Sequence, residues 1–147
     1  MKRTMSAIVS ILVAGLITAP ALAREATKEE AACLKAYHQV HDALAKDDLA
    51  AAKKSASELA EKATAAKCGP AAKEHAEELA KSNSLESARE HFKAISAECI
   101  KMAAGIDGQY VFNCPMAKAE WLQTDGKQVS NPYMGKKMPT CGELKKS

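Results

Sequence analysis

The sequence predicts a mainly α-helical fold: an antiparallel four-helix bundle with a small irregular cap at the C-terminus that contains a β-hairpin. Apolar residues recur at three- and four-residue spacing through most of residues 24–104, as they do along buried helix faces. Aromatic residues make up only 4% of the chain while alanine is abundant, which suits closely approaching helices better than a large enzyme core. From residue 105 the helical spacing stops and turn-forming residues take over, so residues 105–147 are predicted to form the cap.

The first 23 residues have the pattern of a cleaved secretory signal peptide. Two basic residues precede an apolar run over residues 7–17, and Ala21-Leu22-Ala23 supplies the small side chains that a signal peptidase accepts. The run is shorter than the roughly 20 residues of a membrane span. We therefore expect a periplasmic protein whose mature chain begins near Arg24 and contains no membrane span.

The charge balance and the motifs exclude several functions. Removing residues 1–23 takes away two basic residues and no acidic ones, so the formal net charge falls from +3 to +1. This weak charge argues against nucleic acid or an anionic membrane as the main partner. The sequence contains no plausible Ser-His-Asp arrangement, no glycine-rich phosphate loop and no Cys-x-x-Cys-His motif for covalent haem. We therefore do not expect an enzyme.

The first two helices have recognisable start and stop signals. Thr27 with Glu30 three residues later has the capping-box pattern and begins the first helix. Asp47 or Asp48 is expected to cap the second helix, which is predicted to end at Cys68-Gly69-Pro70. The predicted inward-facing residues of these helices are Cys33, Tyr37, Val40, Leu44, Leu49, Ala52, Ala56, Leu59 and Ala63.

The third and fourth helices complete the predicted bundle. The third begins near Pro70 and breaks at Ser82-Asn83-Ser84, and the fourth stops at Gly105. Short connections favour antiparallel neighbours, which gives an up-down-up-down arrangement. The predicted inward-facing residues of these helices are His75, Ala76, Leu79, Leu85, Ala88, Phe92, Ile95, Cys99 and Met102.

The helical part contains three cysteines, which the predicted bundle gathers at one end. Cys68 lies about 14 residues before the Ser82-Asn83 turn and Cys99 about 16 residues after it, so the two fall at nearly the same height. We prefer a Cys68–Cys99 disulfide, with Cys33–Cys68 as the alternative if the loop at Cys68 curls back. Cys99 as a simple buried apolar residue is the third interpretation. A copper store lined by cysteines along the bundle is disfavoured, because these three cysteines lie at one end.

The C-terminal part predicts a hairpin within a small irregular unit. Residues 110–112 are expected to form a short strand that pairs with residues 120–122, between turns at Asp107-Gly108 and Thr124-Asp125-Gly126. A unit of roughly 40 residues rarely holds together without a cross-link, a metal or a surface to dock on.

The cap contains a long ordered motif. It consists of Tyr110-Val111-x-x-Cys114-Pro115-Met116, then Trp121-Leu122, then Asn131-Pro132-Tyr133-Met134-Gly135-x-Lys137-Met138-x-x-Cys141-Gly142-Glu143. The motif closely resembles the C-terminal signature of domain-of-unknown-function family 3347, and Tyr37 and Arg89-x-x-Phe92-x-x-x-Ser96 resemble its helical half. The likeness covers about residues 33–145. It implies an exported bacterial domain related to the tail of periplasmic adaptor subunits of copper and silver efflux pumps, and so an accessory role in efflux.

The cap motif also predicts a soft-metal site. Thiolate and thioether sulfur favour Cu(I) or Ag(I) over Zn(II), and an indole face can cover the bound cation. Cys-Pro-Met and Met-Pro-x-Cys-Gly resemble the two knuckles of small heavy-metal-binding modules, with Ala117 and Met138 in place of the usual histidine and second cysteine. The expected metal site consists of Cys114, Met116, Trp121, Met134, Met138 and Cys141.

Two functions remain open at this point. The first is a periplasmic Cu(I) or Ag(I) binding or delivery module in metal resistance. In the second, Cys114 and Cys141 form a disulfide, the methionines and Trp121 pack the cap onto the bundle, and the protein is a metal-free interaction domain. Its partner would be an efflux adaptor or another envelope protein.

The histidines form a weaker candidate site. His38 and His41 lie three residues apart on the first helix, and His91 on the fourth helix could approach them to bind Cu(II) or Zn(II) through imidazole. Half-exposed histidines without a ligand are the alternative interpretation, and His75 is not part of the expected site.

Overall fold

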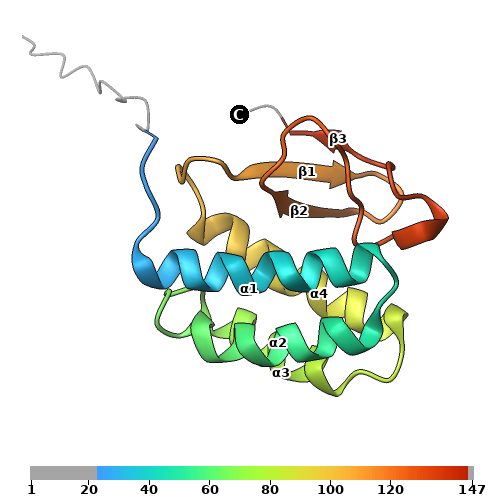
Figure 1. Cartoon of the computed structure of the whole chain (residues 1–147), viewed down its shortest axis with the longest axis horizontal. Coiled ribbons are helices and arrows are strands. Elements are labelled where there is room, and N and C mark those ends of the chain that lie inside the picture. Colours follow the sequence, from blue (N-terminus) through green and yellow to red (C-terminus); the bar gives the residue numbers. More distant parts are fainter. Residues whose placement is uncertain (1–22, 146–147) are drawn as a thin grey trace, which may run out of the picture.

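The computed structural model describes residues 23–145 and confirms the predicted fold class (Figure 1). The predicted signal peptide lies, apart from Ala23, outside the described residues and stays a prediction. No helix in the described part of the chain is both long enough and apolar enough to cross a membrane. The elements are α1 (Lys28–Ala45), α2 (Leu49–Ala63), α3 (Pro70–Lys81), α4 (Leu85–Met102), β1 (Tyr110–Cys114), β2 (Ala119–Gln123), a 3₁₀ turn η1 (Gly135–Lys137) and β3 (Glu143–Leu144).

The helices and the sheet stack in three layers. α1 and α4 lie between the small sheet on one side and the α2–α3 pair on the other (Figure 1). The predicted inward stripes face this interior: Leu49, His75, Leu85 and Met102 are half-buried, and all the other predicted inward residues are buried. Helical spacing in the sequence was therefore sufficient to define the core face of each helix.

Side-chain caps define three helix starts. At α1 the Glu30 amide donates to Thr27 Oγ1 (3.2 Å) and the Thr27 amide donates to the Glu30 carboxylate (2.9 Å), which is the predicted capping box. Asp48 caps α2, since its carboxylate accepts from the Ala51 amide (2.9 Å). Ser84 caps α4 in the same way. Each cap satisfies an amide that the helix itself leaves unpaired.

The end of α2 differs from the prediction. The helix was expected to reach Cys68, but it ends at Ala63. Residues 64–68 form a Schellman turn, in which the Cys68 amide donates to Ala63 O (3.0 Å) and the Lys67 amide donates to Thr64 O (3.2 Å). Lys67 adopts the left-handed conformation (φ 54°) that this turn requires. The turn ends the helix and sends Cys68 back toward the bundle.

The cap contains the predicted hairpin and one further strand. β1 pairs with β2 as an antiparallel hairpin, as the sequence predicted, and the register places Phe112 opposite Trp121. β3 pairs with the other edge of β1, so the strand order is β2-β1-β3. β3 was not predicted, because a two-residue strand has no periodicity to detect.

Polar contacts tie the cap to the helices. The Leu122 amide on β2 donates to the Tyr37 hydroxyl (3.1 Å), which also bonds Ser96 Oγ on α4 (2.8 Å). Arg89 on α4 donates to Pro132 O in the cap (2.8 Å) and to Leu44 O at the end of α1 (2.9 Å). The buried apolar residues of helices and cap form one continuous cluster.

Candidate metal centre

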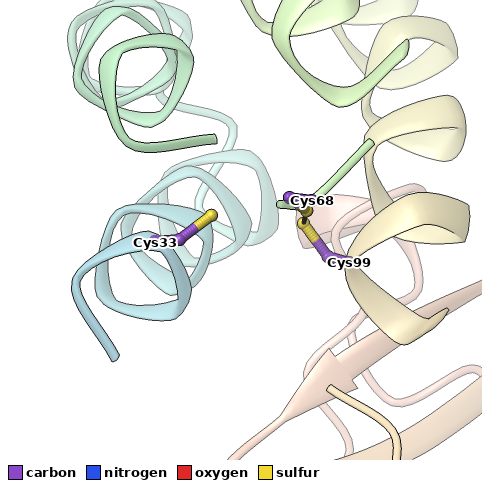
Figure 2. Close-up of side chains that lie close together, drawn as sticks. All are labelled: Cys33, Cys68 and Cys99. Atoms are coloured by element: carbon purple, nitrogen blue, oxygen red, sulfur yellow. Dashed lines mark hydrogen bonds between the residues drawn. The ribbon is translucent and has the colours of Figure 1, made fainter. Parts of the chain in front are cut away.

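Three cysteines from three separate elements meet at one end of the bundle. Cys33 lies near the start of α1, Cys68 follows α2, and Cys99 lies near the end of α4. Their Sγ atoms all lie within 4.8 Å of one another, and those of Cys68 and Cys99 are 3.0 Å apart. Figure 2 shows the three side chains pointing toward a common centre. We call Cys33, Cys68 and Cys99 the bundle-end cluster.

Helix direction explains this convergence. α1 runs away from the cluster, whereas α2 and α4 run toward it, so the start of α1 meets the ends of α2 and α4. Cys33 and Cys99 belong to the inward stripes of their helices. The Schellman turn then brings Cys68 inward, and no cysteine of the cluster is more than 1% exposed.

The three thiols influence one another's ionisation. Hydrogen bonds from the Cys68 and Cys99 thiols lower the pKa of Cys33, because they stabilise a thiolate there. The interaction with Cys33 raises the pKa of Cys68, and burial and the Glu98 carboxylate raise it further. The interactions with Cys33 and Cys68, together with burial, raise the pKa of Cys99. The cluster therefore favours one negative charge and resists a second.

The cluster offers three sulfur donors. Within residues 23–145 no histidine, aspartate or glutamate joins the group. Structural zinc sites are almost always closed by four ligands, whereas thiolates favour soft ions such as Cu(I). A buried three-sulfur group can therefore hold a soft metal ion.

The predicted bundle disulfides are not formed. All five cysteines are free thiols in the structure. The expected closeness of Cys68 and Cys99 is confirmed, but their sulfurs are 3.0 Å apart, beyond the roughly 2.05 Å of a disulfide bond. The sequence interpretation treated these cysteines two at a time and so missed the three-sulfur site. The available signal was that all three lie at the same end of the bundle.

The two predicted cap cysteines also meet. The Sγ atoms of Cys114, at the end of β1, and Cys141 lie 3.1 Å apart, and we call these residues the cap pair. Burial opposes ionisation of Cys114, but hydrogen bonds from Cys141 and the Ala117 amide outweigh it and lower its pKa. The pKa of Cys141 is raised, chiefly by its hydrogen bond to Cys114. Cys114 is buried and Cys141 is half-buried.

The other predicted cap ligands have different surroundings. Met116 is 63% exposed, Met138 is half-buried, and Met134 packs against the core. Trp121 is fully buried, stacks on Phe112 with ring centroids 5.7 Å apart, and meets Tyr133 edge-on. Its indole N–H donates to Gln123 Oε1 (2.8 Å). Trp121 thus contributes to the core that holds the cap.

The indole also lies beneath the loop that carries Cys141. A Cβ atom placed on Gly142 would come within 2.6 Å of Trp121 Cη2. Only glycine permits this close approach, which explains the Cys-Gly order at this point in the motif. The ring edge therefore lies next to Gly142, the residue after Cys141, while its face is stacked on Phe112.

The three histidines expected to approach one another have separate partners. His38 Nε2 bonds Gln109 Oε1 (2.9 Å), and burial lowers its pKa. His41 lies between Asp42 Oδ1 and Ser130 O. His91 Nδ1 bonds Nδ1 of His75 on α3 (3.1 Å), a histidine outside the predicted site. His75 and His91 meet because α3 packs against α4, and the spacing of residues within one helix does not reveal such packing.

A family model described as "Protein of unknown function (DUF3347)" matches residues 33–109. The chain belongs to this family. The matched range contains nearly all of the helical part and includes the whole bundle-end cluster, whereas the cap motif that first suggested the DUF3347 family lies outside it. No curated protein and no solved structure matches the chain.

Proposed function

We propose that this DUF3347 protein is a periplasmic module that binds and delivers Cu(I) or Ag(I) in metal resistance. The observation that supports this function is the bundle-end cluster, three buried sulfurs within 4.8 Å of one another. Three cysteine sulfurs are soft ligands, which favour monovalent coinage metals.

Charge favours a monovalent ion in this setting. The cluster readily supplies one thiolate, and one Cu(I) with one thiolate and two thiols forms a neutral site. Zn(II) with three thiolates would leave a net negative charge in an apolar interior, which is costly. The adjacent Glu98 carboxylate adds to that cost, because it is negative and faces the loop at Gly69.

The loop that carries Cys68 provides a means of release. Cys33 and Cys99 lie on helices, while Cys68 lies on the Schellman turn. Two backbone hydrogen bonds close this turn, and Lys67 in it has the left-handed backbone conformation. Opening residues 64–69 would withdraw one of three ligands and leave the helices intact. Delivery to a partner, such as an efflux adaptor, would then proceed by ligand exchange at this loop.

The test is a Cu(I) titration of reduced protein without oxygen, in the presence of a competing chelator of known affinity. We expect one Cu(I) per chain at the bundle-end cluster. Cys33→Ser should weaken binding by on the order of 100-fold or more, since even supporting residues around a metal are worth about 10–100-fold.

The matched control is the Cys114→Ser, Cys141→Ser double variant, which removes both thiols of the cap pair and leaves the bundle-end cluster unchanged. It should retain Cu(I) binding, and circular dichroism should show helical structure in every variant. If the wild-type protein binds no Cu(I) at low micromolar concentration, the proposal is wrong. The protein is then better explained as a metal-free domain that docks on an envelope partner through its cap.

A further inference from the structure

The bundle-end cluster has the composition of a binding site for a trivalent, three-coordinate centre. Three thiols approach from α1, from the loop before α3 and from α4, so they surround a centre from three directions. No fourth donor of the histidine, aspartate or glutamate type joins them within residues 23–145. An atom that forms three bonds and keeps a lone pair matches this donor set.

We propose that the cluster also binds trivalent arsenic, taken up as arsenous acid. This inference deepens the proposed function, because it rests on the same three reduced thiols. The reaction is a ligand exchange: arsenous acid, two thiols, one thiolate and one proton from solvent give three As–S bonds and three water molecules, with two S–H bonds and three As–OH bonds broken. Arsenic remains trivalent and sulfur remains in its thiol oxidation state, so the step needs no oxidant or reductant.

The charge of the product favours this ligand. Arsenous acid is uncharged, and so is the product with three As–S bonds. The cluster lies within the apolar core, where an uncompensated charge is expensive. The charged side chain that faces the loop at Gly69 is the Glu98 carboxylate, paired with Lys101 at 2.7 Å, and it cannot balance an anionic complex. A neutral product avoids that cost entirely.

The donor count separates this cluster from the cap pair. The cap pair offers two thiols, and the Ala117 amide that contacts Cys114 donates a hydrogen bond and cannot serve as a ligand. Two thiols can replace only two of the three As–OH groups, so one hydroxyl would remain. We therefore expect arsenite to bind the bundle-end cluster in preference to the cap pair.

The experiment uses the reduced protein with all five cysteines present. Protein kept reduced with a phosphine is incubated with arsenite, treated with an alkylating reagent under conditions that open the buried sites, and mapped by mass spectrometry. Arsenite should protect Cys33, Cys68 and Cys99 together and leave Cys114 and Cys141 reactive. The intact mass should increase by one arsenic minus three hydrogens per chain.

Variants test the donor count. Cys33→Ser should no longer show the mass increase of one arsenic minus three hydrogens. Its arsenite affinity should fall by on the order of 100-fold, as expected for the loss of a ligand. The Cys114→Ser, Cys141→Ser control should behave like the wild type. Protection of only two cysteines, or of the cap pair alone, would overturn the inference, and the wild-type measurement decides this even if a serine variant fails to fold.

The Cu(I) titration separates this inference from the proposed function. Cu(I) binding without arsenite protection refutes the arsenic inference and leaves the proposed function in place. Arsenite protection without Cu(I) binding refutes the proposed function and leaves the arsenic inference in place. If the protein binds neither ligand, both proposals are wrong.

Discussion

The protein has two places where cysteine sulfurs meet, and they differ in donor number and burial. The bundle-end cluster gathers three sulfurs from three elements, none of its residues more than 1% exposed. The cap pair brings together two sulfurs, one buried and one half-buried. The first is enclosed by helices and the second lies at the end of a strand.

The difference shows that sulfur density along the chain is a poor guide to sulfur density in space. The cap contains two cysteines and three methionines in one short segment, yet Met116 is exposed and Met134 packs on the core. The bundle-end cysteines are widely separated in sequence and still converge. Two packed helices and the turn at Cys68 bring distant sulfurs together, whereas the methionines of the cap have different surroundings.

The largest expected effect is the loss of stability when a buried side chain is removed from the core of the cap. Trp121→Ala deletes a fully buried indole stacked on Phe112 and should lower the free energy of unfolding by about 3–5 kcal/mol. Met116→Ala, in the same cap but largely exposed, should change it by no more than about 0.5 kcal/mol. Urea denaturation measures both values. A Trp121→Ala variant with unchanged stability would show that the helices do not depend on the cap.

The two sulfur sites should also oxidise at different rates. With oxidised glutathione, the cap pair should form a disulfide at least about tenfold faster than the bundle-end cluster, because exchange requires access and a thiolate. Cys141 is half-buried and the pKa of its partner Cys114 is lowered, while the cluster is enclosed. Timed alkylation with peptide mapping measures the order. Faster oxidation of Cys68 and Cys99 would show that the Schellman turn opens readily.

Acid should loosen the connection between cap and helices. Burial alone would raise the pKa of Asp47, but the Arg89 guanidinium and the Lys136 amide outweigh it and lower the pKa below the ordinary 3.8. The stabilisation is therefore present above pH 3.8 and is lost as pH falls through the lower folded pKa. We expect a loss of about 1 kcal/mol. Asp47→Asn should remove this part of the pH dependence in acid denaturation curves.

The smallest expected effect gives the sharpest comparison of the two sites. The triple variant Met116→Ala, Met134→Ala, Met138→Ala removes the thioethers of the cap and leaves the bundle-end cluster intact. Cu(I) affinity measured against a competing chelator should remain within about twofold, because the proposed ligands are untouched. A large loss of affinity in a variant that is still helical would assign the metal to the cap instead.

Local sequence signals predicted most of the fold. The Thr27–Glu30 capping box, the stripes of α1 and α4, and the hairpin of residues 110–112 with residues 120–122 all appear in the structure as expected. These features depend on interactions between residues close in sequence or on a fixed period, so pattern alone reveals them. β3 escaped prediction because two residues carry no period.

The candidate site was only partly predictable. The sequence placed three cysteines at one end of the bundle and put Cys68 beside Cys99. It did not show that α2 ends at Ala63, because Lys67 is an unusual residue for a left-handed turn. The single turn that follows brings Cys68 to the other two sulfurs and makes a three-donor site from an expected disulfide.

The sequence by itself therefore determined the helices, their buried faces, the hairpin and the family resemblance. Tertiary structure alone decided that Cys33 joins Cys68 and Cys99, and that His91 meets His75 rather than His38 and His41. The physical reason is that periodicity reports the face of an element, whereas a ligand set depends on the heights and angles at which elements pack.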